Sequence, residues 1–313
     1  MNRRTVAKIL KKKHKEFIES IEDEKVKELV DKNSIITGGS IVSLLTDEPV
    51  KDFDYYFSNK ETVLAVAKYY IDQFMKAHPD WEKGNNKTDV PTVVEDGDRV
   101  KIVVQSAGII GEGSEEGYEY FEGGPDENAM DYVESVLSDA DETDVKPLET
   151  SVKKKYRPVY MSSNAITLAN NVQLVIRFYG NPEDIHKNYD FVHCTNYWTS
   201  GDGHLTLKPE ALESILTKEI KYQGSLYPLC SVIRARKFIQ RGWRINAGQF
   251  LKMCFQISQL DLTKISVLEE QLTGVDAAYF FQVIEYCKKR EAEDPEFKIT
   301  TPYLVTIIDK IFG

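Results

Sequence analysis

Two short motifs near the start of the chain combine residue types that can bind a phosphate and a metal. Gly38, Gly39 and Ser40 are followed by a short apolar stretch, and Asp52 and Asp54 come after it. Glycine lets the backbone approach a phosphate closely, and backbone amides with a serine hydroxyl can hold one. Residues i and i+2 of a strand point to the same face, so Asp52 and Asp54 could bind the same pair of metal ions. The alternative is an ordinary turn with two solvated aspartates at a strand edge, although aspartate is uncommon in strands.

The whole segment from Gly38 to Asp54 carries a family resemblance. Its apolar stretch ends in Leu44-Leu45, Pro49 lies in a turn, and Lys51 precedes the aspartates. In this register the segment resembles the head-domain signature of the poly(A) polymerase and CCA-adding branch of the polymerase-β-type nucleotidyltransferases. The resemblance implies an enzyme that binds an NTP such as ATP and uses two Mg²⁺ ions, with Mn²⁺ as an alternative. Val42-Ser43 stands where that branch has Arg-Asp.

A third carboxylate is expected, because two-metal transfer needs a group near the acceptor hydroxyl. By the resemblance it should lie on a neighbouring strand. Asp190 is the candidate, since it lies in the apolar and aromatic run 189–194, which is typical of a strand and where a bare carboxylate is costly to bury. The sequence therefore predicts Asp190 as a catalytic and metal-binding residue. Alternatively, Asp190 ends a loop and caps it, and Glu183 or Asp184 would replace it.

A basic stripe is predicted on a helix in the C-terminal half. Arg234, Lys237 and Arg241 recur at i, i+3 and i+7, and residues 220–260 contain no acidic residue. Such a stripe favours a phosphate counterpart, either a triphosphate or an RNA backbone. The segment also resembles the neck helix of CCA-adding enzymes and bacterial poly(A) polymerases, which implies that Arg234 and Lys237 contact the incoming nucleotide. The alternative is a solvated basic face.

Two smaller features complete the set of candidate residues. The Ser-Ser-Asn-Ala segment at 162–165 resembles a family segment near the ribose, which implies a nucleotide contact for Asn164. In the family that segment follows the catalytic strand, whereas here it precedes the predicted one. His193 and Cys194 are adjacent on the predicted strand and would point to opposite faces, so a zinc site is not expected there.

Composition places the chain among soluble globular proteins. It has 313 residues, of which 42% are hydrophobic and 29% charged. No apolar run approaches the ~20 residues of a membrane span, so no membrane partner is expected. The first residues lack the apolar core of a signal peptide, and the four cysteines are scattered. Reduced thiols in the cytoplasm are therefore expected, or in the host cytoplasm if the protein is viral.

The net charge of −10 is unevenly distributed. Residues 112–150 hold fourteen acidic residues and one lysine, which leaves +3 for the rest of the chain. An acidic protein is ordinarily a poor candidate for binding nucleic acid. Because the acid is confined to one segment, that objection is weakened.

The predicted fold class is α+β, with three parts. Residues 1–31 are an N-terminal helical segment, 32–207 a nucleotidyltransferase head, and 208–313 an all-α domain. The head contains an insertion at about 84–155, of which 112–150 is acidic. Segments 34–58, 165–168 and 172–178 predict strands, with a helix between the strands of the first.

The function expected is transfer of a nucleoside monophosphate from an NTP to an acceptor hydroxyl, with release of pyrophosphate. An RNA 3′ end suits the basic helical part. A protein or small-molecule hydroxyl, as in toxin-like members of the superfamily, suits the loss of Arg-Asp at 42–43. A non-catalytic nucleotide- or RNA-binding protein is the third alternative, and the intact Asp52 and Asp54 pair argues against it.

Overall fold

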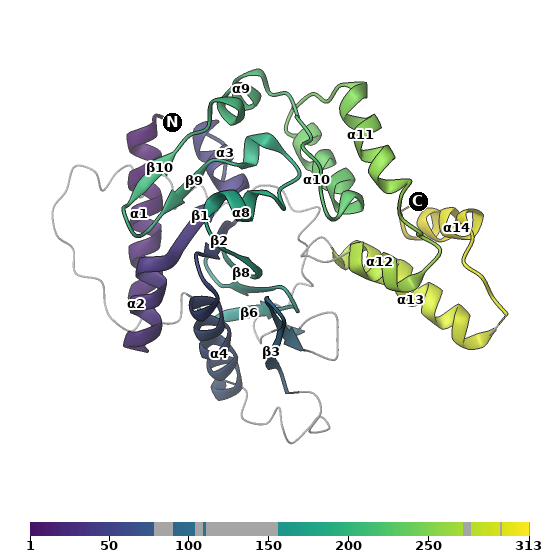
Figure 1. The fold of residues 1–313 in the computed structure, drawn as a ribbon, viewed down its shortest axis with the longest axis horizontal. Helices are drawn as coiled ribbons and strands as arrows, with labels where there is room; N and C mark the ends of the chain where they lie inside the picture. Colours follow the sequence, from purple (N-terminus) through teal and green to yellow (C-terminus); the bar gives the residue numbers. More distant parts are fainter. Residues whose placement is uncertain (78–89, 104–108, 111–155, 272–276, 295, 313) are drawn as a thin grey trace. The chain divides into compact units, whose positions relative to one another are not determined.

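The computed structural model describes residues 1–77, 90–103, 109–110, 156–271, 277–294 and 296–312 (Figure 1). Most of the expected acidic insertion, including all of 112–150, lies outside these residues. The chain is a mixed α/β protein with a sheet and several helices, and it divides into two compact units. The first comprises Met1–Lys187 and His193–Ile215, the second Asn188–Val192 and Leu216–Gly313.

This division differs from the predicted domains at two places. The N-terminal helices α1 (Arg3–Glu19) and α2 (Glu24–Asn33) are part of the first unit, because their apolar faces join the same hydrophobic core as the sheet. The short segment Asn188–Val192 belongs to the second unit although it lies within the predicted head.

An eight-stranded sheet organises the first unit, with the strand order β10-β9-β1-β2-β8-β7-β6-β5. Neighbouring strands are antiparallel except β2 and β8, which are parallel. The strands are β1 (Ser34–Thr37), β2 (Phe53–Phe57), β5 (Ile109–Ile110), β6 (Pro158–Met161), β7 (Ala165–Leu168), β8 (Val172–Tyr179), β9 (Tyr197–Thr199) and β10 (His204–Thr206). A separate hairpin pairs β3 (Thr92–Asp96) with β4 (Arg99–Val103).

The predicted strand–turn–helix–strand unit at 34–58 is confirmed. It consists of β1, the short helix α3 (Gly39–Leu45) and β2. The strands predicted at 165–168 and 172–178 are confirmed as β7 and β8, and Asn170 and Asn171, with φ of 64° and 57°, lie in the turn that joins them. Asparagine tolerates this left-handed conformation better than most residues.

One face of the sheet is buried in the main core. Alternate residues of β2, Phe53, Tyr55 and Phe57, are at most 2% exposed. They pack with apolar residues of α1, α2 and α4 (Lys60–Ala77). Because side chains alternate along a strand, Asp54 and Tyr56 project from the opposite face. The position of the core therefore decides which face of β2 is available for chemistry.

The second unit is mainly helical, as predicted for the C-terminal part. One of its apolar clusters gathers Val283, Cys287, Ile299 and Ile307. The helices after the sheet are α9 (Pro209–Thr217), which spans the boundary between the units, α10 (Pro228–Gln240), α11 (Ala247–Ile257), α12 (Ile265–Gln271), α13 (Ala277–Glu293) and α14 (Thr301–Phe312).

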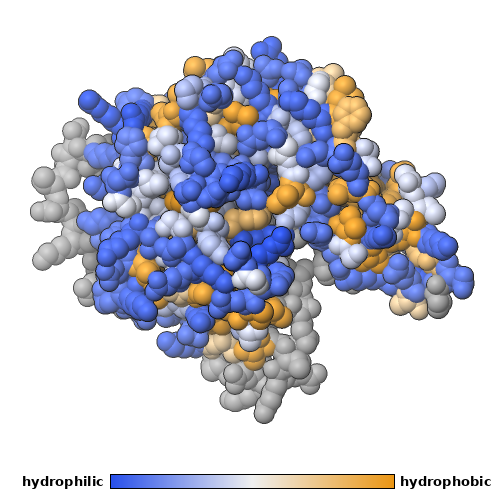
Figure 2. Space-filling view, viewed as in Figure 1, coloured by the Kyte–Doolittle hydropathy of each residue, from blue (hydrophilic) through white to orange (hydrophobic). Residues whose placement is uncertain are grey.

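Helix α11 leaves part of its apolar surface uncovered within this unit. Phe250, Leu251 and Phe255 are 41%, 55% and 68% exposed. Figure 2 shows hydrophobic residues in orange, and orange atoms lie at the surface where Figure 1 places α11. Among the described residues, no helix is long and apolar enough to cross a membrane.

Candidate functional site

The glycine turn at the end of β1 leaves open space beside the backbone. Gly38 has φ 90° and ψ −150°, a conformation that other residues rarely adopt, and it precedes the first residue of α3. Its amide donates to the carbonyl oxygen of Cys194 at 3.2 Å, which fixes the turn against the chain before β9. A Cβ atom added to Gly39 would meet nothing within 4 Å. A ligand could therefore approach this backbone closely.

Ser40, the next residue of α3, is buried. Its residue is 2% exposed, and its hydroxyl oxygen is buried with no hydrogen-bond partner in the described part of the chain. A buried hydroxyl without a partner is uncommon in proteins. Its proposed phosphate contact stays a prediction.

Asp52 and Asp54 flank the buried Phe53 at the start of β2. Both carboxylate-bearing residues are half-buried. Asp54 lies directly opposite Thr37 on β1 and directly beside Gln173 on the parallel strand β8. Thr37 is the residue immediately before Gly38, so the register brings the β2 carboxylate next to the glycine turn.

A network of polar side chains contacts Thr37 on the face of the sheet that bears Asp54. The ring of His186, at the end of α8 (Pro182–His186), places Nε2 at 2.9 Å from the Thr37 hydroxyl oxygen, and the Lys208 ammonium lies 3.2 Å from its Nδ1. A lysine can only donate, so Nδ1 must accept and Nε2 carries the proton that is donated to Thr37. The Thr37 hydroxyl in turn donates to the carbonyl oxygen of Asn196 at 2.8 Å.

Burial and charge keep that imidazole neutral. Burial, and secondarily the positive charge of Lys208, lowers the pKa of His186 to about 3. Lys208 is 26% exposed at its side chain and also pairs with Glu183 at 3.3 Å. The network therefore places the Lys208 cation, which contacts the neutral His186 ring and the Glu183 carboxylate, on the side of the sheet that bears Asp54.

The prediction of a strand at 189–194 is wrong. Val192–Cys194 forms a short 3₁₀ helix, and Phe191 makes only an isolated bridge to Tyr222. The alternating polar and apolar pattern has another cause: the Phe191 ring packs on Tyr222 and on Phe238 within the second unit. Asp190 consequently lies in an irregular segment and is not held on a sheet.

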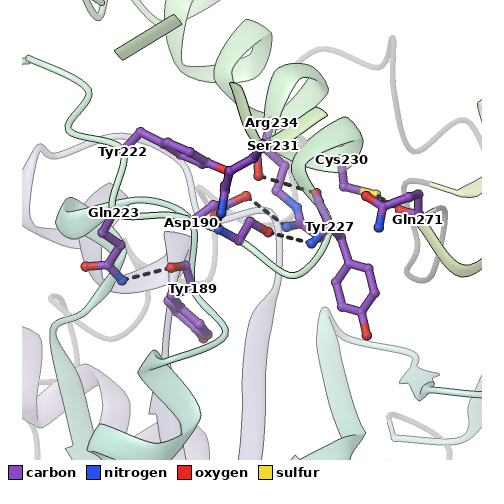
Figure 3. Close-up of polar contacts among 11 residues, drawn as sticks. Tyr189, Asp190, Tyr222, Gln223, Tyr227, Cys230, Ser231, Arg234 and Gln271 are labelled. Carbon is purple, nitrogen blue, oxygen red and sulfur yellow. Dashed lines mark hydrogen bonds and ion pairs between the residues drawn. The ribbon is translucent and has the colours of Figure 1, made fainter. Parts of the chain in front are cut away.

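Within the second unit, Asp190 is 6% exposed and paired with Arg234 (Figure 3). Its Oδ2 accepts from the Arg234 guanidinium at 2.9 Å, and its backbone carbonyl accepts from the amide of Gln223 at 2.9 Å. Burial, with a smaller contribution from the Asp190 charge, raises the pKa of nearby Tyr222 to about 12. Metal binding by Asp190 stays a prediction.

The basic stripe on α10 is present, but one of its members has an acidic partner. Arg234 binds Asp190, a residue outside the acid-free segment. Arg241 lies over the Phe238 ring, with its guanidinium carbon 5.1 Å from the ring centroid. Lys237 is half-buried on the same helix. Nucleotide binding by these three side chains stays a prediction.

Asn164 lies in the turn between β6 and β7 and contacts Arg177. Its side-chain oxygen accepts from the Arg177 guanidinium at 3.3 Å, and its carbonyl accepts from the amide of Ile176. Through these contacts Asn164 connects the turn between β6 and β7 to β8. A ribose contact stays a prediction.

Sequence reasoning missed three residues of the first unit that the structure draws together. They are Gln173, His186 and Lys208. Gln173 could have been found as the one polar residue in the apolar run 172–176. His186 and Lys208 give no such signal, because their proximity depends on how the chain folds. Among the described residues, no group of three or more His, Cys, Asp and Glu is arranged to hold a metal ion.

Residues 8–218, more than half of the chain, match the Gabija anti-defense 2 family. The chain belongs to this family. The match covers β1, α3 and β2 with the glycine turn and both aspartates, and it ends shortly after α9. Most of the matched residues lie in the unit that holds the eight-stranded sheet.

Similarity to solved structures is weak. The Thermotoga maritima CCA-adding enzyme complexed with tRNA is 11% identical, with a TM-score of 0.37 over 88% of this chain and 52% of that one. A tRNA-processing enzyme is 12% identical, with a TM-score of 0.30 over 91% of this chain and 71% of that one. The chain spans about half the length of the CCA-adding enzyme. No curated protein matches the sequence.

Proposed function

We propose that this member of the Gabija anti-defense 2 family is a metal-dependent nucleotidyltransferase with a polymerase-β-like head. One observation carries the proposal: Asp54 lies directly opposite Thr37, the residue that leads into the glycine turn. This register sets a carboxylate beside a backbone with open space at Gly39. The sequence resemblance over 38–54 to the poly(A) polymerase and CCA-adding branch supports the same function.

The residues at this place have the chemistry that a magnesium ion requires. Asp52, just before β2, and Asp54, within it, offer carboxylate oxygens near the start of this strand, and hard divalent cations prefer such ligands. When bound, Mg²⁺ would polarise the phosphoryl group and neutralise its charge. We propose that Asp52 and Asp54 hold it.

The other residues of the first unit would bind and orient the nucleotide. The backbone at Gly38 and Gly39 would approach the triphosphate, and the Lys208 cation would contribute positive charge on the same side of the sheet. Because the His186 imidazole is neutral, it can hold Lys208 and Thr37 without competing for phosphate. These groups supply position and charge and need not exchange a proton with the substrate.

Two acceptors are candidates, each on its own ground. An RNA 3′ end is the acceptor that the basic stripe on α10 favours, with Arg234, Lys237 and Arg241 near a phosphate backbone. A component of the Gabija defence system is the second candidate, because the family's name describes counteraction of that system. In that case transfer of a nucleotide would modify, and so inactivate, a protein or nucleic acid of the defence.

The test is transfer of label from each of the four α-labelled NTPs, with Mg²⁺, to total RNA and to purified Gabija components in parallel. We expect label in one acceptor class, with at least about a hundredfold loss in the Asp52→Asn and Asp54→Asn variants. Asp72→Asn, an exposed aspartate on α4, is the matched control and should transfer normally. Equal transfer by Asp54→Asn and Asp72→Asn would contradict the proposed mechanism.

A further inference from the structure

Four neighbouring strands each carry one polar residue in mutual register. Thr37 lies opposite Asp54, Asp54 beside Gln173, and Gln173 opposite Thr167. Residues directly opposite each other on neighbouring strands project from the same face. This polar row, formed by Thr37, Asp54, Gln173 and Thr167, therefore crosses β1, β2, β8 and β7 on the face turned away from the main core.

Gln173 is the buried member of the polar row whose side chain has no partner among the residues described. It is 8% exposed, and no described residue hydrogen-bonds its amide. The hydroxyl of the adjacent Thr167 is buried without a partner in this part of the chain. A ligand bound at this place would give both side chains a hydrogen-bond or coordination partner.

The register puts the Gln173 amide within reach of a cation held by Asp54. Neighbouring strands are ~4.8 Å apart, and a glutamine side chain is one methylene longer than an aspartate. Val172 and Leu174, on either side of Gln173, are fully buried on the core face, so the strand fixes which way Gln173 projects. Side-chain amide oxygens are among the ligands that hard divalent cations accept.

We propose that Gln173 is the third protein ligand of the metal, supplying an amide oxygen beside Asp52 and Asp54. This inference rests on the proposed function and assigns to Gln173 the place that a third carboxylate was expected to fill. A neutral third ligand leaves the protein's contribution at two negative charges. The metal is then held firmly only when phosphate oxygens of the nucleotide complete its coordination, which is how Mg²⁺ is commonly bound.

The experiment is a titration of the protein with Mn²⁺ alone, without nucleotide, followed by electron paramagnetic resonance of the free ion. Gln173→Glu adds a third charge to the ligand set and should tighten Mn²⁺ binding by about tenfold or more, because charge count tunes affinity at such sites. Gln173→Leu keeps the size, removes the oxygen and should weaken binding. Gln259→Glu adds the same charge at an exposed position of the second unit and should leave the affinity unchanged.

The outcomes separate this inference from the proposed function. If Asp54→Asn abolishes Mn²⁺ binding while Gln173→Glu and Gln173→Leu both bind as the wild type does, Gln173 is not a ligand and the inference is overturned. If the wild type and Asp54→Asn bind Mn²⁺ equally, the metal site itself is wrong. Thermal unfolding of each variant with and without Mn²⁺ checks folding, and we expect the largest metal-dependent rise in Tm for Gln173→Glu.

Discussion

The ammonium of Lys13 donates to the backbone carbonyl of Asn170 at 2.6 Å, from the buried face of α1 to the turn that precedes β8. The neighbouring carbonyl, that of Asn171, accepts from the amide of Phe53 at 2.8 Å. Lys13 also lies over the Phe53 ring, 5.0 Å from its centroid. Lys13, which is 1% exposed, thus contacts the start of β2 on its core face, next to Asp52 and Asp54.

Replacing this lysine should loosen the start of β2. Lys13→Met keeps most of the apolar stem of the side chain but leaves the Asn170 carbonyl without its donor, and we expect a loss of about 1–3 kcal/mol in the free energy of unfolding. Mn²⁺ binding should weaken with it. Urea unfolding measures the first effect. Lys11→Met makes the same change at an exposed position of α1, and an equal effect of the two variants would show that the buried contact contributes nothing.

The two glycines of the turn should respond differently to alanine. Gly38→Ala forces a Cβ into φ 90° and should cost about 1–3 kcal/mol of stability. Gly39→Ala meets no atom within 4 Å and lies in the first turn of α3, so stability should be unchanged or raised by up to ~1 kcal/mol.

Gly39→Ala should weaken nucleotide binding although it leaves the protein stable. The methyl group of Gly39→Ala occupies the space through which a phosphate would approach, so NTP affinity should fall by about tenfold, or ~1.4 kcal/mol. Isothermal titration with Mg²⁺ and each NTP measures it. Unaltered NTP affinity in a stable Gly39→Ala protein would place the triphosphate elsewhere.

Stability should fall in mild acid because two histidines are buried in their neutral form. Burial lowers the pKa of His14 to about 4 against the opposing effect of Asp31, and the pKa of His186 to about 3. Between these values and 6.5 the unfolded chain binds protons that the folded chain does not. The contribution of these two histidines to stability is therefore constant above pH 6.5 and decreases below it, by about 1.4 kcal/mol per pH unit for each group.

Urea unfolding at a series of pH values checks the sign of this dependence. His186→Gln should reduce the slope below pH 6.5 and His14→Gln should do the same. His204→Gln, which replaces an exposed histidine, is the control variant for both. Stability that rises as the pH falls from 6.5 to 5 would contradict the buried neutral state of both rings.

The Asp190–Arg234 pair should act on the stability of the second unit. We expect Asp190→Asn and Arg234→Gln each to lower it, with a coupling energy of about 1–3 kcal/mol in a double-mutant cycle. Mn²⁺ affinity should not change in either variant. If Asp190→Asn instead abolished Mn²⁺ binding, the sequence-based prediction of Asp190 as a metal ligand would be correct.

Local patterns were sufficient to predict the unit around the glycine turn. Residues 34–57 follow one another along the chain, and their alternation, glycines and apolar stretch each specify one element. The helices of the second unit were predicted for the same reason. By contrast, the pairing of Asp54 with Gln173 joins strands that are far apart in the sequence, and no local pattern encodes such a register.

Two failures have specific physical causes. The run 189–194 has the alternation of a strand, but its apolar residue Phe191 is buried by Tyr222 and Phe238 and not by a sheet. Lys13 follows Val6, Ile9 and Leu10 at helical spacing on the apolar face of α1. A lysine at such a position indicates a buried partner, yet the sequence does not show that the partner is a carbonyl at Asn170.

The central claim is that the glycine turn and the β2 carboxylates form one metal–nucleotide site, and NTP binding in the presence and absence of Mg²⁺ tests it without an acceptor. We predict that the wild type and Asp72→Asn bind an NTP only with Mg²⁺, and that Asp54→Asn loses this binding. NTP binding that is independent of Mg²⁺, or that survives intact in Asp54→Asn, would contradict the account.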